Sequence, residues 1–302
     1  MEARTPSKLV EVEVEGRRLR LSNLDKPMYP RAGFNKGQVI DYYTRAASAL
    51  LPHLRGRPLT LKRYPNGVEG EHFYEKQCPG HRPDWVATAR IRTGRREIDF
   101  CLCNDLPTLV WAANLADLEL HPSLSLAARI EQPTAMAFDL DPGEPAGLAE
   151  CSEVALLLRD ALAHLGLDSY PKSSGSKGMQ VYVPLNVNAV TYERTKPFAH
   201  ALARHLEGQH GKLVVSSMKK SLRRGKVLID WSQNDEHKTT VCVYSLRARE
   251  RPTVSTPLRW EEVERGDPDG LVFEAEDALA RIEEHGDLFA PVVEQRQELP
   301  EL

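Results

Sequence analysis

Alternating apolar and polar positions open the chain. Residues 9–23, LVEVEVEGRRLRLSN, alternate on both sides of a Glu-Gly pair, which is typical of a β-hairpin. Residues 35–54, NKGQVIDYYTRAASALLPHL, place apolar residues three and four positions apart, so they predict a helix with Asn35 as its N-cap. The following segments predict a strand at 58–65, a loop at 66–80 and paired strands at 85–93 and 97–104.

Helical and strand patterns continue to alternate in the rest of the chain. We expect helices at 105–120, 148–167 and 192–210, with Asp105 as the N-cap of the first. We expect strands at 134–142, 169–173, 179–185, 212–218, 226–233 and 239–248, and a loop and short helix at the end. This mixed order predicts an α/β (mixed α+β) fold. No linker or repeat divides residues 1–302, so we expect a single domain.

Composition narrows the class of protein. Hydrophobic residues are 41% and charged residues 27% of the 302 residues, as in an ordinary globular protein. No apolar run approaches the roughly 20 residues of a membrane span, and the N-terminus lacks the apolar core of a signal peptide. An odd number of cysteines, five, does not indicate a disulfide framework. A cytoplasmic, reducing location is therefore expected.

The net charge of −3 argues against indiscriminate nucleic-acid binding, although the distribution of charge matters more than its sum. Basic residues gather in GRRLRL, LKRY, IRTGRRE and SSMKKSLRRGK, whereas acidic residues collect late in the chain. The sequence is therefore compatible with a basic working face.

The stretch AMAFDLDPGE carries two aspartates in an expected strand. Asp139 and Asp141 are two residues apart, so they point to the same face. Either they are solvated at a turn, or they bind hard metal ions such as Mg²⁺ or Mn²⁺. Asp230 follows the apolar run VLI and is the best third carboxylate, while Asp235 lies in a polar loop and is the weaker candidate.

Three further features suit phosphate or sugar recognition. The loop SSGSKG includes Ser174 and Lys177 and offers backbone N–H groups, but it is not a Walker A motif and could be a flexible turn. His121 is either structural or a donor to a phosphate or ribose oxygen. Arg247 ends an expected strand and is either a surface cation or a ligand for a triphosphate.

Four residues have a spacing that could bind structural zinc: Cys78 and His81, then Cys101 and Cys103. Buried free thiols are the alternative, and we favour that interpretation because the C-x-C pair lies in an apolar strand.

These motifs, in this order, resemble the polymerase domain of bacterial ATP-dependent DNA ligase D, in the archaeo-eukaryotic primase superfamily. LSNLDKPMYP, LKRYPNGVEGEHFYEK, VWAANLADLELHP and FDLDPGE are similar to the same family, so the resemblance extends from about Leu21 to about Arg249. It implies a primase-polymerase core with an RRM-like sheet and an added N-terminal sheet and helix layer. It also implies a template-dependent nucleotidyltransferase that extends primers and fills short gaps in non-homologous end joining or gap repair, with a preference for ribonucleotides.

The resemblance also implies roles for particular residues. Asp139, Asp141 and Asp230 would be catalytic ligands of two Mn²⁺ or Mg²⁺ ions. The incoming NTP or dNTP would contact Lys62, His121, Ser174, Lys177, Gln233 and Arg247. The 5′-phosphate of gapped DNA would contact Asn23, Lys26 and Lys36. Template and primer would contact Phe73, Tyr74, Lys76 and Arg223.

Some expectations depart from the family or leave alternatives open. The chain has no ligase or nuclease domain, so it is either an excised domain or a stand-alone relative. We expect a stand-alone monomer, with a separate ligase and the end-binding protein Ku as candidate partners. Lys36 could instead be a solvated first-turn lysine, and Phe73 a core residue. A non-catalytic nucleic-acid-binding module and a metal-dependent nuclease are the rival functions.

Overall fold

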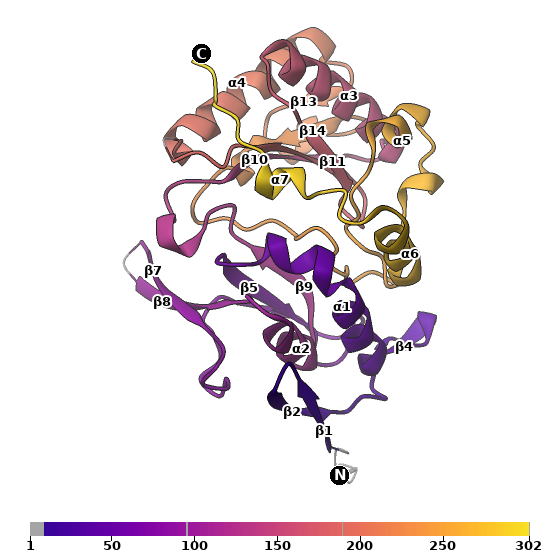
Figure 1. The fold of residues 1–302 in the computed structure, drawn as a ribbon. Coiled ribbons are helices and arrows are strands. Elements are labelled where there is room, and N and C mark those ends of the chain that lie inside the picture. The colour runs from indigo at the N-terminus through magenta and orange to yellow at the C-terminus, as the bar shows by residue number, and fades with distance from the viewer. Residues whose placement is uncertain (1–8, 95, 189, 302) are drawn as a thin grey trace.

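The chain begins with the expected hairpin in the computed structural model, which describes residues 9–94, 96–188 and 190–301. Strands β1 (Leu9–Val14) and β2 (Arg17–Ser22) pair antiparallel. Between them, Glu15 and Gly16 have φ angles of 46° and 76°, which is the conformation required by a tight two-residue turn. Figure 1 shows this hairpin at the N-terminal end of the molecule.

A five-stranded sheet and two helices form the N-terminal lobe (Figure 1). The strands are β6 (Phe73–Glu75), β5 (Pro58–Arg63), β8 (Arg96–Leu102) and β7 (Thr88–Thr93), with β9 (Asp117–Pro122) also paired to β5. Helices α1 (Lys36–Leu50) and α2 (Leu106–Asn114) pack against each other. Asn35 caps α1 as expected, because its side chain accepts from Gln38 N while the Gln38 side chain accepts from Asn35 N.

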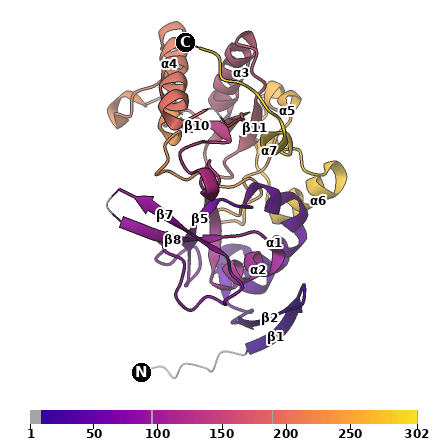
Figure 2. The ribbon, with the colours of Figure 1, turned by 60° about the vertical axis from the view of Figure 1, so that its left-hand side comes forward.

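A second five-stranded sheet forms the C-terminal lobe. Its strands, in order, are β11 (Tyr170–Ser173), β12 (Met179–Pro184), β10 (Ala135–Pro142), β14 (Val227–Asp230) and β13 (Val214–Val215). Helices α3 (Leu148–His164) and α4 (Tyr192–His210) cover the outer face of this sheet (Figure 2). The expected α/β class is thus confirmed.

The remaining elements are short. They are strands β3 (Pro27–Tyr29) and β4 (Phe34–Asn35), helices α5 (Trp260–Arg265), α6 (Ala275–His285) and α7 (Pro291–Glu294), and the 3₁₀ helices η1 (Pro30–Ala32), η2 (Leu51–His53), η3 (Ala127–Arg129), η4 (Lys220–Leu222), η5 (Trp231–Gln233) and η6 (Asp269–Leu271). Among the described residues, no helix is both long and apolar enough to cross a membrane.

The side chains of β10 alternate between an apolar face and a polar face of the C-terminal sheet. Phe138 and Leu140 are fully buried in a cluster that includes Val154 and Leu158 of α3. The aspartates between and after them point to the opposite face. The α3–α4 layer therefore holds the aspartate-bearing strand rigidly from behind.

The segment 117–120 was expected to continue the helix from Asp105, and this prediction was wrong. Helix α2 ends at Asn114, and Ala116 has a φ angle of 61°, which a helix cannot contain. The chain then forms β9, fully buried and paired along its length with β5. Strand pairing in the core therefore outweighs the helical spacing of the apolar residues.

The strand expected at 239–248 is also absent from the described structure. This segment runs beside β9, where Thr240 N and Cys242 N donate to backbone oxygens of that strand. Further on, Tyr244 adopts a φ angle of 61°, and the Ser245 hydroxyl accepts from Leu120 N in place of a backbone partner. The Ser245 side chain thus takes the place of a backbone acceptor opposite β9, so the segment forms no regular strand.

Neither interpretation of the cysteine pattern is correct for all four residues. Cys78 and Cys101 form a disulfide, which removes two of the four proposed zinc ligands and contradicts the expectation that the cysteines are all reduced. Cys78 reaches β8 because its N–H donates to Asp99 O. Cys103 is a buried free thiol, and His81 is exposed rather than in the core with the cysteines.

Asn234 is a buried side chain that completes the hydrogen bonding of β10. Its Oδ1 accepts from Ala137 N, and its Nδ2 donates to Ala137 O and Trp231 O. Replacement Asn234→Ala leaves these buried groups unpaired, so we expect the free energy of unfolding to fall by about 2–4 kcal/mol. Urea unfolding checks this, with exposed Glu283→Ala as the control. A loss below about 0.5 kcal/mol would contradict the assigned role.

Candidate active site

A row of four polar side chains crosses the C-terminal sheet. Lys172 on β11 pairs with Gln180 on β12, Gln180 with Asp139 on β10, and Asp139 with Asp230 on β14. Register partners point to the same face, so these four residues form one polar rung opposite the α3–α4 layer. Asp141 lies on the same face and is half exposed. The structure thus brings together the three aspartates that the sequence singled out.

The surroundings of Asp139 weaken it as an acid. Burial raises its pKa to about 6, and the charges of Asp230 and Asp141 add to this effect. The Gln180 amide donates to Asp139 Oδ1 at 3.0 Å and opposes the rise. Asp139 therefore carries a proton more readily than an ordinary aspartate.

Each carboxylate has hydrogen-bond donors of its own. Asp230 Oδ1 accepts from the Ser232 backbone and hydroxyl, and Gln233 Nε2 donates to Asp230 Oδ2 at 2.9 Å. Arg223 Nη1 donates to Asp141 Oδ2 at 3.2 Å. Arg223, from the basic segment SSMKKSLRRGK, thus reaches Asp141 and balances part of its charge.

The aspartates fit a hard metal ion by their chemistry and position. Carboxylate oxygens are the ligands that Mg²⁺ and Mn²⁺ prefer, and mutual repulsion in a buried rung is relieved by a cation. Across the described parts of the chain, however, no three His, Cys, Asp or Glu side chains are already gathered at metal-binding distances. Metal binding therefore requires these carboxylates to turn from their present donors toward a shared ion.

The polar rung opens into a cavity of about 310 Å³. Eight predicted residues line it: Tyr74, His121, Asp139, Asp141, Ser174, Lys177, Gln233 and Arg247. Ser176 and Gly178 of the expected SSGSKG loop line it as well, together with residues that the sequence did not single out: Leu140, Gln180, Thr239, Thr240 and Val241. Residues from both lobes thus meet at one polar hollow. A larger groove of about 640 Å³ between α3 and α4 is mostly apolar and lies on the other side of the sheet.

The SSGSKG loop is held close to β10 and to Arg247. Ser174 Oγ accepts from the backbone N–H groups of Ser176 and Gly178, so these two groups are not free for a phosphate as expected. A Cβ atom at Gly178 would lie 2.0 Å from Leu140 O, so only glycine allows this approach. Lys177 is exposed beside the cavity, 3.3 Å from Glu144.

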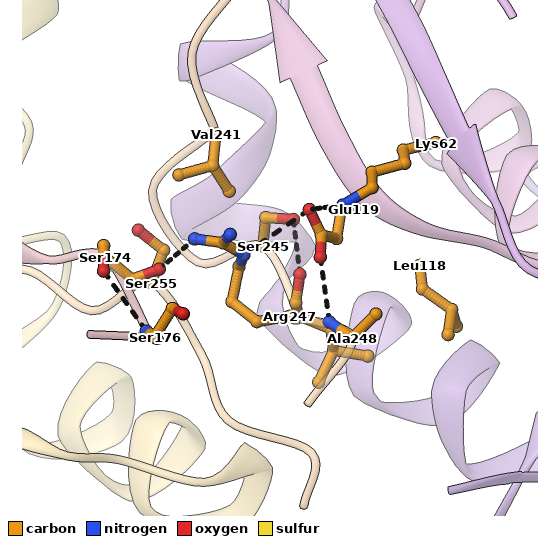
Figure 3. Close-up of polar contacts among 12 residues, drawn as sticks. Lys62, Leu118, Glu119, Ser174, Ser176, Val241, Ser245, Arg247, Ala248 and Ser255 are labelled. Atoms are coloured by element: carbon orange, nitrogen blue, oxygen red, sulfur yellow. Dashed lines mark hydrogen bonds and ion pairs between the residues drawn. The ribbon is translucent and has the colours of Figure 1, made fainter. Parts of the chain in front are cut away.

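Glu119 is a central residue of the site that the sequence analysis missed. Its buried carboxylate lies 3.0 Å from Lys62 Nζ and 3.5 Å from Arg247 Nε (Figure 3). Its Oε1 accepts from Ala248 N at 3.0 Å, and its Oε2 lies 3.0 Å from His121 Nε2. Three residues expected to contact the nucleotide are therefore held by one carboxylate. The missed signal was LELH, because Glu119 and His121 share a face in a strand but not in a helix.

The expected template-side residues separate on the two faces of β6. Tyr74 lines the cavity and lies edge-on to His121, with ring centroids 5.8 Å apart. Phe73 points the other way, where the Arg63 guanidinium lies 5.2 Å from its ring, and it is exposed rather than part of the core. Lys76 Nζ lies 3.5 Å from His237 O. Only Tyr74 of these three borders the cavity.

The residues expected at a 5′-phosphate lie in the N-terminal lobe. Lys36 Nζ donates to Ser22 O at 2.7 Å, and Lys26 Nζ to Asn66 at 3.1 Å. Burial lowers the pKa of Lys36 to about 8, helped by the charges of Lys26 and Arg63. Lys36 is therefore buried, which excludes the solvated first-turn alternative. Asn23, at a φ angle of 54°, shapes the turn before Lys26.

Two adjacent residues of β5 connect the cavity with the residues expected at the 5′-phosphate. Lys62 is held by Glu119 beside the cavity, while Arg63 is the charge near Lys36. Consecutive strand residues point to opposite faces, so Lys62 and Arg63 extend from opposite faces of β5.

Comparison with known proteins agrees with this geometry. Asp139 and Asp141 of a central strand, the SSGSKG loop and the cations Lys177 and Arg247 line one cavity in an α/β fold of the primase-polymerase class. Residues 35–289 match the family described as LigD, primase-polymerase domain. The chain belongs to this family.

Two curated relatives and one solved structure are similar to the chain. It is 41% identical over 277 residues to the multifunctional non-homologous end joining protein LigD of Mycolicibacterium smegmatis, covering 91% of this chain and 36% of that protein. It is 33% identical over 284 residues to the bifunctional non-homologous end joining protein LigD of Bacillus subtilis, covering 94% and 45%. The chain thus spans less than half the length of these relatives.

The polymerase domain of Mycobacterium tuberculosis ligase D, solved in complex with DNA, has a similar structure. The TM-score is 0.87 at 37% identity, covering 93% of this chain and 99% of that one. The family resemblance and the primase-polymerase fold expected from the sequence are confirmed.

The raised pKa of Asp139 predicts a specific effect of Asp139→Asn on stability. The native pKa of about 6 lies above the ordinary 3.8, so the ionised carboxylate destabilises the fold increasingly as the pH rises from about 4 to 6. Without metal at pH 8, Asp139→Asn should therefore be more stable than wild type, by up to roughly 3 kcal/mol. Urea unfolding with EDTA measures this, and a destabilised variant would contradict the buried-charge account.

A divalent metal ion should make the wild type more stable than Asp139→Asn. We expect Mn²⁺ to raise the Tm of the wild type at pH 8, and less at pH 5.5, because protons compete for Asp139. Asp139→Asn should lose most of this increase. An equal increase in the variant would show that the ion binds elsewhere.

Proposed function

We propose that this chain is a template-dependent nucleotidyltransferase that extends primers and fills short gaps in DNA. The observation that carries the proposal is the cavity itself: Asp139 and Asp141 line it together with Arg247, Lys177 and the Ser174 loop, and Asp230 is the register partner of Asp139. Acidic groups for ions and basic groups for phosphates thus meet where a triphosphate has room. The names of the relatives support non-homologous end joining as the setting.

Several side chains would position the incoming nucleotide. Arg247 and Lys177 would neutralise the triphosphate, and preorganised cations of this kind stabilise charge that develops during transfer. Gln233 would link the nucleotide to Asp230, which it already contacts. Tyr74 would stack on a base, which tolerates any sequence and contributes about 1–3 kcal/mol. The primer hydroxyl would be directed at the α-phosphate by the Arg223-containing loop.

The three aspartates would hold two Mn²⁺ or Mg²⁺ ions, which would activate the primer 3′-hydroxyl and stabilise the leaving pyrophosphate. The Gln180 amide would keep Asp139 oriented while its charge is shared with the ions. Arg223 would have to leave Asp141 when nucleotide and metal bind, because the same carboxylate oxygens are needed.

The downstream strand of a gap would be held by Asn23, Lys26 and Lys36. Phosphate contacts position DNA without reading its sequence, as a repair polymerase requires. Phe73, which is exposed, and Lys76, which is half-buried, lie outside the cavity and would contact the template. A cytoplasmic location, a monomeric state, a preference for ribonucleotides, and work alongside Ku and a separate ligase remain predictions of the family resemblance.

Primer extension on a gap with a 5′-phosphate tests the proposal. Wild type should incorporate nucleotides with Mn²⁺ or Mg²⁺, and Asp139→Asn should reduce incorporation at least about 1,000-fold while DNA binding is kept. Exposed Asp41→Asn is the control. If wild type incorporates nothing but releases nucleotides from labelled DNA without added triphosphate, the chain is a nuclease. If it does neither and only binds DNA, the non-catalytic alternative is correct.

Recognition of the 5′-phosphate should depend on pH through Lys36. Because the pKa of Lys36 is about 8, its side chain is positively charged below that pH and loses the charge above it. The ratio of affinities for phosphorylated and unphosphorylated gaps should fall between pH 7 and pH 9. Lys26→Ala should lower the same ratio about tenfold at pH 7, because one charge-assisted hydrogen bond is lost. Exposed Lys212→Ala is the control, and equal ratios in all variants would exclude these residues from the phosphate site.

A further inference from the structure

The groups that contact Glu119 have one property in common: all of them can donate. Lys62 Nζ, Ala248 N and the Tyr64 hydroxyl donate to its carboxylate, and Arg247 Nε lies close enough for an ion pair. Its side chain is only 3% exposed, so water contributes little. A buried carboxylate surrounded by donors is stable as an acceptor alone.

Glu119 is ionised under ordinary conditions. Burial alone would raise its pKa, but the hydrogen bond with His121 and the charges of Arg247 and Lys62 hold the pKa far below its usual range. An ionised carboxylate oxygen cannot donate a hydrogen bond. The His121 Nε2 atom, 3.0 Å from Glu119 Oε2, must therefore carry the hydrogen of that contact.

The other ring nitrogen of His121 is then an acceptor. Burial lowers the pKa of His121, and the nearby Arg247 and Lys62 add to the decrease, so the ring is neutral at pH 7. A neutral imidazole with hydrogen on Nε2 has a lone pair on Nδ1. His121 lines the cavity beside Tyr74, so the acceptor belongs to the same hollow as the polar rung.

This assignment decides between two ligands for His121. A phosphate oxygen accepts hydrogen bonds and cannot pair with a lone pair on Nδ1. A sugar hydroxyl donates, so it is complementary to Nδ1. Glu119 also holds the cations Lys62 and Arg247. Arg247 donates through Nη1 to Ser174 O as well, so it connects Glu119 to the SSGSKG loop (Figure 3).

We propose that Glu119 is a positioning residue that fixes the tautomer and orientation of His121, so that Nδ1 accepts a hydrogen bond from the 2′-hydroxyl of the incoming ribonucleotide. It also holds Lys62 and Arg247 at the cavity. The inference rests on the proposed nucleotidyl transfer, and it makes discrimination between ribose and deoxyribose depend on a residue that does not contact the nucleotide.

Glu119→Gln tests the inference by steady-state incorporation of ribo- and deoxyribonucleotides into the same gap. The amide removes the charge and adds a donor where only donors are present. We expect KM for the ribonucleotide to rise about tenfold and the ratio of ribo to deoxyribo kcat/KM to fall at least threefold. Glu262→Gln is the matched control, because Glu262 pairs with the partly buried Arg281 away from the cavity. The control should keep both values.

A second measurement reads the tautomer without activity. ¹⁵N-histidine NMR of the wild type, with the His121 signals assigned from the spectrum of His121→Asn, should show hydrogen on Nε2 and a bare Nδ1. Hydrogen on Nδ1 would overturn the inference, as would a Glu119→Gln variant with unchanged KM and ratio, or a wild type that incorporates both sugars equally. If the wild type incorporates no nucleotide, the proposed function fails, and NMR still decides the tautomer. A variant that fails to fold leaves the wild-type spectrum and sugar ratio as the deciding results.

Discussion

The repulsion between Asp139 and Asp230 is the constraint around which this structure is arranged. The β10–β14 register places the two carboxylates opposite each other, in a sheet whose other face is closed by α3 and α4. Neither side chain can leave without moving a strand, so the surroundings must supply donors. Gln180, Gln233 and Ser232 do so, and they come from β12 and η5, which both border the cavity. The shape of the site follows from the need to stabilise these charges.

A second buried carboxylate organises the other side of the cavity. Glu119 faces cations and a neutral ring rather than other acids, so its pKa falls where that of Asp139 rises. Burial alone would raise the pKa of both residues, and the sign of the neighbouring charges decides whether the pKa ends above or below its ordinary value. Cations therefore balance the charge of Glu119, whereas acidic neighbours oppose the charge of Asp139.

Much of the fold could be predicted where local pattern and tertiary packing agree. The β1–β2 hairpin, the Asn35 cap, α4 and the aspartate strand β10 all formed close to their expected bounds. The prediction failed at β9, where apolar spacing suited a helix but pairing with β5 in the core favoured a strand. That error hid Glu119, because its relation to His121 exists only with a two-residue period. The disulfide between Cys78 and Cys101 was equally invisible, since it depends on a loop that returns to β8.

Strand β5 has a consequence for how this protein can evolve. Lys62 pairs with Glu119 and the adjacent Arg63 lies near Lys36, so a single stretch of backbone carries residues of both proposed ligand sites. Any substitution that slides or twists this strand displaces both side chains together. Natural variation is therefore expected to tune the regions through their outer partners, such as Glu119 and Lys26, while the path of β5 itself stays fixed. Homologous chains with altered nucleotide preference should differ around this strand rather than within it.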